Sequence, residues 1–154
     1  MKPVDNIFYD AIQADIALMA AIGGRVRSTC FEVPPYEDDN TPIPNIIITD
    51  EGFVSASTTK DTVWESGEDR VQVGVDIAAA SPNDVKELVK MVRKAIENYI
   101  CTMYRDGEDI PQLEPNSPSS DGIAWDWQKP CYYTKLTYQC TMPTDLYDNE
   151  QESN

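Results

Sequence analysis

A long helix with a complete start signal constrains the fold most. It begins at Ser81-Pro82, because serine is a preferred N-terminal cap and proline fits the first helical position. Acidic Asp84 follows, near the positive end of the helix dipole. Apolar residues then recur at helical spacing to about residue 104: Val85, Leu88, Val89, Val92, Ile96, Tyr99, Ile100 and Met103. The pattern predicts an amphipathic helix with one buried side.

A strand with strict alternation precedes this helix. Val71, Val73, Val75 and Ile77 alternate with Gln72, Gly74, Asp76 and Ala78. This period is typical of a strand with one core face and one wetter face. We expect residues 70–79 to pair with residues 62–65 as an antiparallel hairpin, because Ser66-Gly67-Glu68-Asp69 between them favours a turn.

Other segments also indicate strands. Residues 25–33 alternate weakly and predict a short strand, while the β-branched run at residues 43–49 is typical of a strand covered on both faces. Residues 50–61 are small and polar, so we expect an extended arm there. A long last strand is predicted by side chains that share one face: Tyr132, Thr134, Leu136, Tyr138, Cys140 and Met142.

The beginning of the chain predicts one helix over residues 5–22. Pro3 and Asp5 supply its start, and Gly23-Gly24 its end. Together the segments predict an α+β fold, with a mostly antiparallel sheet of about 4–6 strands, two main helices on one face and the polar arm between strands.

The chain of 154 residues has the size of one domain. We expect a single α+β domain over residues 1–142 that carries a loop insertion at residues 105–130, followed by an acidic C-terminal tail at residues 143–154. The insertion is rich in proline, serine and acids, and is longer than ordinary connections, which is typical of functional or mobile segments. The tail has four acidic residues and no basic one, so we expect it to be solvated.

The net charge limits the function. It is −15, from 27 acidic and 12 basic residues, which argues against a surface that grips nucleic acid. An acidic surface still suits a channel through which DNA passes without binding. No apolar stretch approaches the roughly 20 residues of a membrane-spanning helix, so we expect a soluble, unexported protein.

Histidine is absent, which excludes catalytic triads built on it. Cys30, Cys101, Cys131 and Cys140 form no CxxC pair, so a zinc site is disfavoured and we expect reduced, mostly buried thiols. These features predict no cofactor, no resident metal and no catalytic residue.

Other chemical sites compete with structural interpretations. Glu37-Asp38-Asp39 and Asp106-Gly107-Glu108-Asp109 offer oxygen ligands, yet neither has the ligand spacing of a calcium loop. Asp121 and Asp126, near Trp125 and Trp127, could form a carboxylate pair of a sugar-processing site, but strand alternation would point them to opposite faces. We favour solvated loops for the acids, and core or subunit-interface packing for the tryptophans.

The charge is unevenly distributed. Residues 83–105 hold five basic and three acidic residues, a net charge of +2, which leaves −17 on the rest of the chain. A basic helix face on an acidic body suits head-to-tail contacts between identical subunits, although a solvated helix with local ion pairs explains it equally well. Candidate interface residues on the helix are Lys86, Lys90, Arg93 and Lys94.

Several segments resemble the tail terminator (tail-completion) proteins of long-tailed bacteriophages. The resemblance is carried by the helix end Ala20-Ala21-Ile22-Gly23-Gly24-Arg25-Val26, the strand Pro42-Ile43-Pro44-Asn45-Ile46-Ile47-Ile48, residues 70–79 running through Ser81-Pro82 into the helix, and the last strand at residues 133–139. The insertion at residues 105–130 and the acidic tail depart from that pattern.

The resemblance implies a structural virion protein without catalytic residues. It implies a homo-oligomeric ring, commonly of six subunits, that caps the tail tube and joins it to the head connector. The partners would be other copies of the chain, the tail tube protein and the connector or stopper protein. The arm would reach a neighbouring subunit or the channel, and the acids in or beside it are Glu51, Asp61, Glu65, Glu68 and Asp69.

Two alternatives remain open at this point. A head-side stopper or adaptor ring of the phage neck would use a similar small α+β subunit. A small hydrolase or carbohydrate-binding domain would instead use Trp125, Trp127, Asp121 and Asp126.

Overall fold

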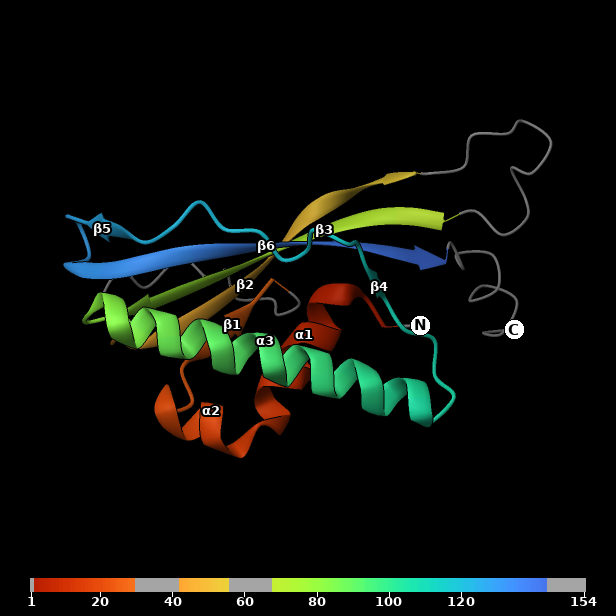
Figure 1. Cartoon of the computed structure of the whole chain (residues 1–154), viewed down its shortest axis with the longest axis horizontal. Coiled ribbons are helices and arrows are strands. Elements are labelled where there is room, and N and C mark those ends of the chain that lie inside the picture. Colours follow the sequence, from red (N-terminus) through yellow and green to blue (C-terminus); the bar gives the residue numbers. More distant parts are fainter. Residues whose placement is uncertain (1, 30–41, 56–67, 144–154) are drawn as a thin grey trace.

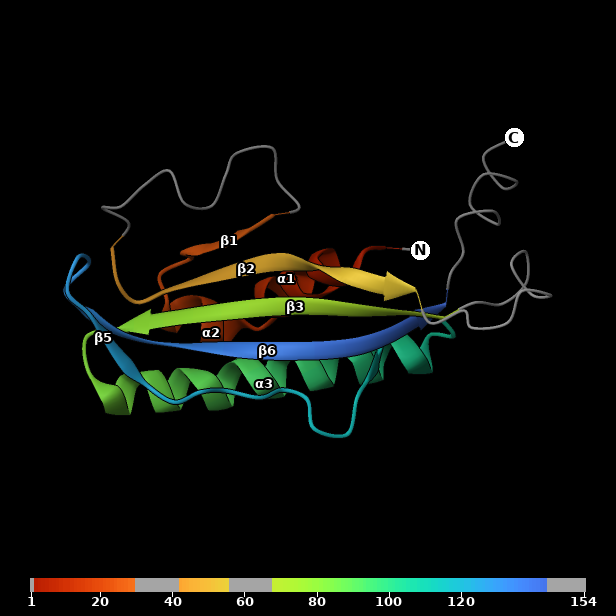
Figure 2. The same cartoon turned by 90° about the horizontal axis from the view of Figure 1, so that it is seen from above.

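The computed structural model describes residues 2–29, 42–55 and 68–143. Within them it has the predicted α+β class, a six-stranded, mostly antiparallel sheet with its helices on one face (Figures 1 and 2). The helices are α1 (Val4–Ala14), α2 (Ile16–Ala21) and α3 (Pro82–Arg105). The strands are β1 (Val26–Ser28), β2 (Asn45–Ser55), β3 (Glu68–Ala79), β4 (Gln112–Leu113), β5 (Ala124–Asp126) and β6 (Cys131–Pro143).

The sheet is built around three long strands. Its order is β1-β2-β3-β6-β4, and β5 pairs with the start of β6. Among the described strands, only β1 and β2 pair in parallel, whereas the other pairs are antiparallel. β1 is shorter than the predicted strand at residues 25–33, of which residues 30–33 lie outside the described part.

The predicted partner of residues 70–79 is wrong. β3 pairs along one edge with β2, from Asn45↔Ala78 to Ser55↔Asp69, and along the other edge with β6. Both of its rows of backbone groups are therefore used by β2 and β6. Residues 62–65, the predicted partner, lie outside the described residues. β2 continues through Ser55 past a bulge between Asp50 and Phe53, so residues 50–55 belong to the sheet and not to a projecting arm.

The single helix predicted over residues 5–22 is broken at Asp15. This residue has an extended backbone, and its carboxylate accepts a hydrogen bond from the Leu18 N–H at 3.0 Å, which caps α2. Ile16, predicted on the apolar stripe, is 86% exposed as a result. The predicted end is confirmed, since Gly23 and Gly24 follow α2 with φ of 59° and 75°.

α3 has the predicted start and length. The Ser81 side chain accepts a hydrogen bond from the Asp84 N–H at 3.2 Å, and Pro82 is the first helical residue. Apolar side chains of the stripe pack onto the sheet, and the helix ends at Arg105 before Gly107, whose φ is 75°. Because α3 starts immediately after β3, its first turns lie at the end of the molecule where β6 begins (Figure 1).

Residues 105–130 extend the sheet. Gln112 and Leu113 pair with β6, Ser119 forms a bridge with Thr137, and β5 pairs with the first residues of β6. The segment thus follows the outer edge of β6 along its length (Figure 2). It satisfies backbone groups that an edge strand would otherwise expose.

The core lies between the sheet and the helices. Phe8 of α1 and Tyr138 of β6 meet edge to face, with ring centroids 4.7 Å apart, and both are buried. The face predicted for the last strand is confirmed, because Thr134, Leu136 and Tyr138 are buried beneath the helices. The prediction that residues 43–49 are covered on both faces is wrong: Ile46 and Ile48 are buried, whereas the alternating Ile47 and Thr49 are only half-buried.

Candidate assembly interface

A groove with a basic rim lies between the first half of α3 and the sheet. Lys86, Lys90 and Arg93 line it, and their spacing of four and three residues places them on one side of the helix. Its apolar lining comes from Val89 of α3, Ile123 before β5 and Leu136 of β6, and its volume is about 450 Å³. These six residues define the basic groove.

The cations of the basic groove are exposed and lightly compensated. Lys90 Nζ lies 3.6 Å from Glu87 Oε1 within the same helix, with both side chains more than two-thirds exposed. Such a surface pair contributes little free energy. Within the described residues, Lys86 and Arg93 form no ion pair. Three cations and one carboxylate, that of Glu87, therefore line a partly apolar groove, which has a net positive rim on a chain whose net charge is −15.

Lys94, the fourth predicted helix residue, is exposed but does not line the groove. The helix turns by about 100° per residue. Lys94 is therefore rotated away from Arg93 around the helix. The sequence placed four basic residues together, and the structure brings three of them onto one groove.

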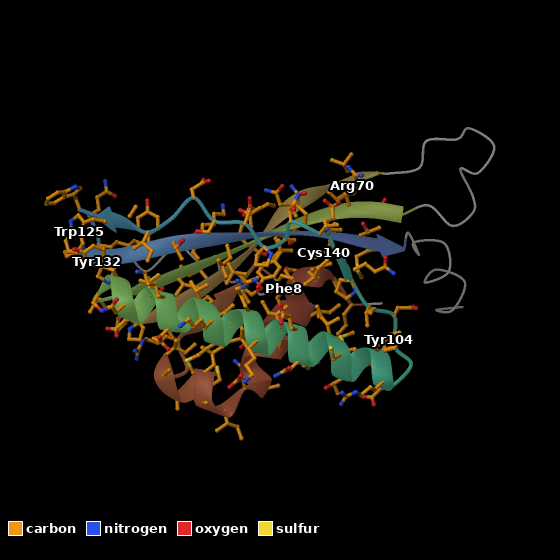
Figure 3. The ribbon with its side chains drawn as sticks, in the orientation of Figure 1. Phe8, Arg70, Tyr104, Trp125, Tyr132 and Cys140 are labelled. Carbon is orange, nitrogen blue, oxygen red and sulfur yellow. The ribbon has the colours of Figure 1, made fainter. Side chains whose placement is uncertain are left out.

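An aromatic cluster lies at the same end of the molecule. Trp125 contacts Tyr132 edge to face with centroids 4.7 Å apart, and Trp127 meets Trp125 at 6.0 Å with an interplanar angle of 83°. Trp127 is 86% exposed, whereas Tyr132 packs against the core. Figure 3 shows Trp125 and Tyr132 at the end of the molecule where α3 begins. Exposed tryptophans are typical of protein interfaces.

Three of the predicted arm acids, Glu51, Glu68 and Asp69, lie in the sheet. Glu51 is on the face away from the helices, where its Oε1 lies 2.9 Å from Lys135 Nζ of β6 and its Oε2 accepts a hydrogen bond from Gln72 at 3.0 Å. Asp69 is a half-buried residue of β3. Glu68 is the first residue of β3, while Asp61 and Glu65 lie outside the described residues.

Asp76 belongs to the same cluster of polar side chains on this face as Glu51 and Lys135. Burial raises the pKa of its carboxyl group, and Glu51 raises it further, while Lys135 opposes the shift. Gly74 lies between them, and a Cβ there would collide with the side chains of Glu51 and Lys135. The missing side chain at Gly74 lets an ion pair span three strands. Sequence reasoning missed Lys135, because this contact depends on register and not on spacing.

A second groove, of about 350 Å³, lies at the opposite end of the sheet. Phe53 and Val54 line it, and both are 68% exposed. Arg70 lies on its other side, where its Nε is 3.4 Å from Glu114 Oε1. Phe53 and Val54 were not predicted as interface residues, although two adjacent apolar residues in a polar segment are a visible signal in the sequence.

The competing carboxylate site lacks support in the geometry. The Asp126 carboxylate accepts hydrogen bonds from the backbone N–H groups of Gln128 and Lys129 at 2.9 and 3.3 Å, so it stabilises its own turn. Trp125 and Trp127 are nearly perpendicular, so they do not form one flat platform for a sugar ring. Asp121 is exposed.

The two acidic loops considered as cation sites differ in whether the structure describes them. Residues 37–39 lie outside the described part, and the side chains at Asp106, Glu108 and Asp109 are exposed. Within the described residues, no three or more histidine, cysteine or carboxylate side chains gather as a metal site would require. No described helix is long and apolar enough to cross a bilayer.

The cysteines are free thiols in the part of the chain that the structure describes. Cys131 and Cys140 are buried, as expected, whereas Cys101 is exposed on α3. Burial raises the pKa of Cys140 to about 12, and burial followed by the nearby Asp126 raises that of Cys131. Cys30 lies outside the described residues.

Several solved structures are similar to this chain. No family model matches the sequence, and no curated protein matches it. Among solved structures, a chain of a particle described as "Virion of native gene transfer agent (GTA) particle" is similar, with 10% sequence identity and a TM-score of 0.47. The similarity covers 91% of this chain and 94% of that chain.

Proposed function

We propose that this chain is a structural virion protein of a tailed bacteriophage. Its role would be that of a tail terminator, a ring of about six copies that caps the tail tube and joins it to the head connector. The proposal rests on the sequence resemblance together with the order of elements in the fold: an opening helical segment, a sheet, the long α3 and a closing strand.

The observation that carries the assembly part is the basic groove on an acidic chain. A contact between different patches of identical subunits closes into a ring when the rotation between subunits allows it. Charge complementarity would orient such a contact, and the apolar lining of the groove would supply buried area. Trp127, which is exposed in the aromatic cluster, would add apolar contact area to such an interface.

We also propose a structural and not a catalytic role. The described carboxylates that competed for a catalytic assignment are exposed or stabilise a turn. An acidic ring would let DNA pass without holding it, since phosphates and carboxylates repel each other.

Assembly is tested by measuring the mass of the purified full chain by light scattering and by imaging the particles. We expect a closed ring that binds tail tube protein. Reversing two groove charges, Lys90→Glu with Arg93→Glu, should weaken assembly at least tenfold. A matched control, Lys2→Glu with Arg105→Glu, changes the net charge equally at exposed positions outside the groove and should assemble normally.

The outcomes separate the candidates. A chain that stays monomeric even with tail tube protein would contradict the proposal. Rings that bind the portal and its adaptor, but not the tail tube, would assign the chain to the head side of the neck. Equal loss of assembly in both charge variants would show that net charge, and not the groove, controls association.

A further inference from the structure

The basic groove needs an occupant with both acidic and apolar side chains. Its rim supplies Lys86, Lys90 and Arg93, and its lining Val89, Ile123 and Leu136. A folded acidic surface would satisfy the cations but would leave the apolar lining in water. An extended segment with carboxylates on either side of an apolar pair satisfies both parts of the groove.

The chain itself contains such a segment after β6. Residues 144–154 read Thr-Asp-Leu-Tyr-Asp-Asn-Glu-Gln-Glu-Ser-Asn, with four acidic residues and no basic one. Leu146 and Tyr147 are adjacent and lie between Asp145 and Asp148. The order of acid, apolar pair and acid matches a groove whose cations surround an apolar lining. We propose that residues 144–154 of one copy bind the basic groove of a second copy.

The reach of the chain excludes binding of the apolar pair to its own groove. Leu136 is seven residues before Pro143 on the same strand, a distance of about 24 Å at the rise of a β-strand. Tyr147 is four residues beyond Pro143, so it reaches at most about 14 Å from it when fully extended. The groove that Leu146 and Tyr147 fill therefore belongs to another molecule.

The polarity of the subunit fits this arrangement. The groove lies at the first turns of α3. β6 ends at the opposite end of the molecule (Figure 1). Each subunit thus carries the root of its acidic segment at one end and the groove at the other. Contacts of this kind are heterologous and repeat from copy to copy. The inference rests on the proposed ring and specifies one of its contacts.

The test uses two full-length variants with complementary charge reversals. The groove variant carries Lys86→Glu, Lys90→Glu and Arg93→Glu, and the tail variant carries Asp145→Lys, Asp148→Lys and Glu150→Lys. Sedimentation velocity measures the assembly of each variant, of their equimolar mixture and of the unmodified chain. We expect each variant alone to assemble at least tenfold more weakly, because its grooves and tails carry like charges.

Mixing is the decisive step. In an alternating ring every acidic groove meets a basic tail and every basic groove meets an acidic tail, so the mixture should recover assembly. Recovery would also show that both variants fold. A mixture that assembles no better than either variant alone would overturn the inference.

The remaining outcomes separate this contact from the ring itself. If the tail variant assembles like the unmodified chain while the groove variant does not, residues 144–154 are not the occupant, and the ring proposal stands with a different acidic partner. If the unmodified chain never assembles, the ring proposal fails and this contact fails with it.

Discussion

The two faces of the sheet are made by the same three strands and differ in chemistry. Toward the helices, β3 presents Val73, Val75 and Ile77, none of which has measurable exposure. Toward the open side, the same strand presents Gln72, Gly74 and Asp76, beside Glu51 and Lys135 of its neighbours. The covered face therefore supplies most of the folding free energy, while the open face holds charge in a fixed pattern. Substitutions on the two faces should have different effects.

The largest expected effect comes from Phe8, on the covered side. Its ring is fully buried against Tyr138, so Phe8→Ala should lower the free energy of unfolding by about 4 kcal/mol through lost contacts and a cavity. Gln139→Ala, exposed on β6, is the control and should change it by less than about 0.5 kcal/mol. Urea denaturation measures both values. Equal losses of unfolding free energy in the two variants would show that the covered side contributes no more to stability than the open face.

Alkaline pH should weaken the covered side next. The pKa of Cys140 rises from the ordinary 9.0 to about 12 because the thiol is buried. In the unfolded chain this thiol ionises above pH 9, whereas in the folded chain it stays neutral, so each pH step between 9 and 12 favours unfolding. Burial raises the pKa of Tyr138 as well, which adds to the loss above pH 10.

The check is the pH dependence of unfolding between pH 8 and pH 11. In Cys140→Ala the free energy of unfolding should fall less steeply over this interval. Its value at pH 8 should be lower than in the unmodified chain, because the substitution leaves a cavity. Cys101→Ala removes an exposed thiol and should keep the slope of the unmodified chain. An unchanged slope in Cys140→Ala would show that this thiol titrates normally.

How far the sequence predicted this arrangement depended on how local each signal was. α3 was predicted in full, because Ser81 and Pro82 act within one turn and the apolar stripe repeats along one helix. The break at Asp15 was missed, since Ile16 and Met19 continue the helical spacing across it. The partner of β3 was missed because a turn-forming cluster indicates a reversal without showing which segment returns.

The candidate site shows the same limit. Its basic rim was predicted, because Lys86, Lys90 and Arg93 belong to one helix. Its apolar lining was not, because Ile123 and Leu136 meet α3 only through tertiary packing. Ile123 belongs to the segment that runs along β6, and Leu136 belongs to β6 itself. Glu51 was assigned to an arm for a related reason: a polar segment was interpreted as a projection, whereas residues 50–55 continue an inner strand.

On the open face, Gly74→Ala should have a moderate effect. The added methyl group would meet the side chains of Glu51 and Lys135, which can move, so we expect a loss of about 1 kcal/mol together with a weakened ion pair. A double-mutant cycle tests the mechanism. Lys135→Ala should cost less in the Gly74→Ala background than in the unmodified chain, and an identical cost in both would show that the methyl group leaves the pair intact.

The smallest effect should come from Asp76, a half-buried residue of the open face. Burial, aided by Glu51, raises the pKa of this carboxyl above the ordinary 3.8. The folded state therefore binds its proton more tightly than the unfolded state, so stability falls as pH rises from 3.8 through the folded pKa. Asp76→Asn lacks this titration and should be slightly more stable than the unmodified chain at pH 7, with the difference vanishing near pH 3. Asp121→Asn, an exposed control, should follow the unmodified chain throughout. Parallel curves for Asp76→Asn and the unmodified chain would mean that Lys135 compensates Asp76 fully, and the open face would then store no electrostatic strain.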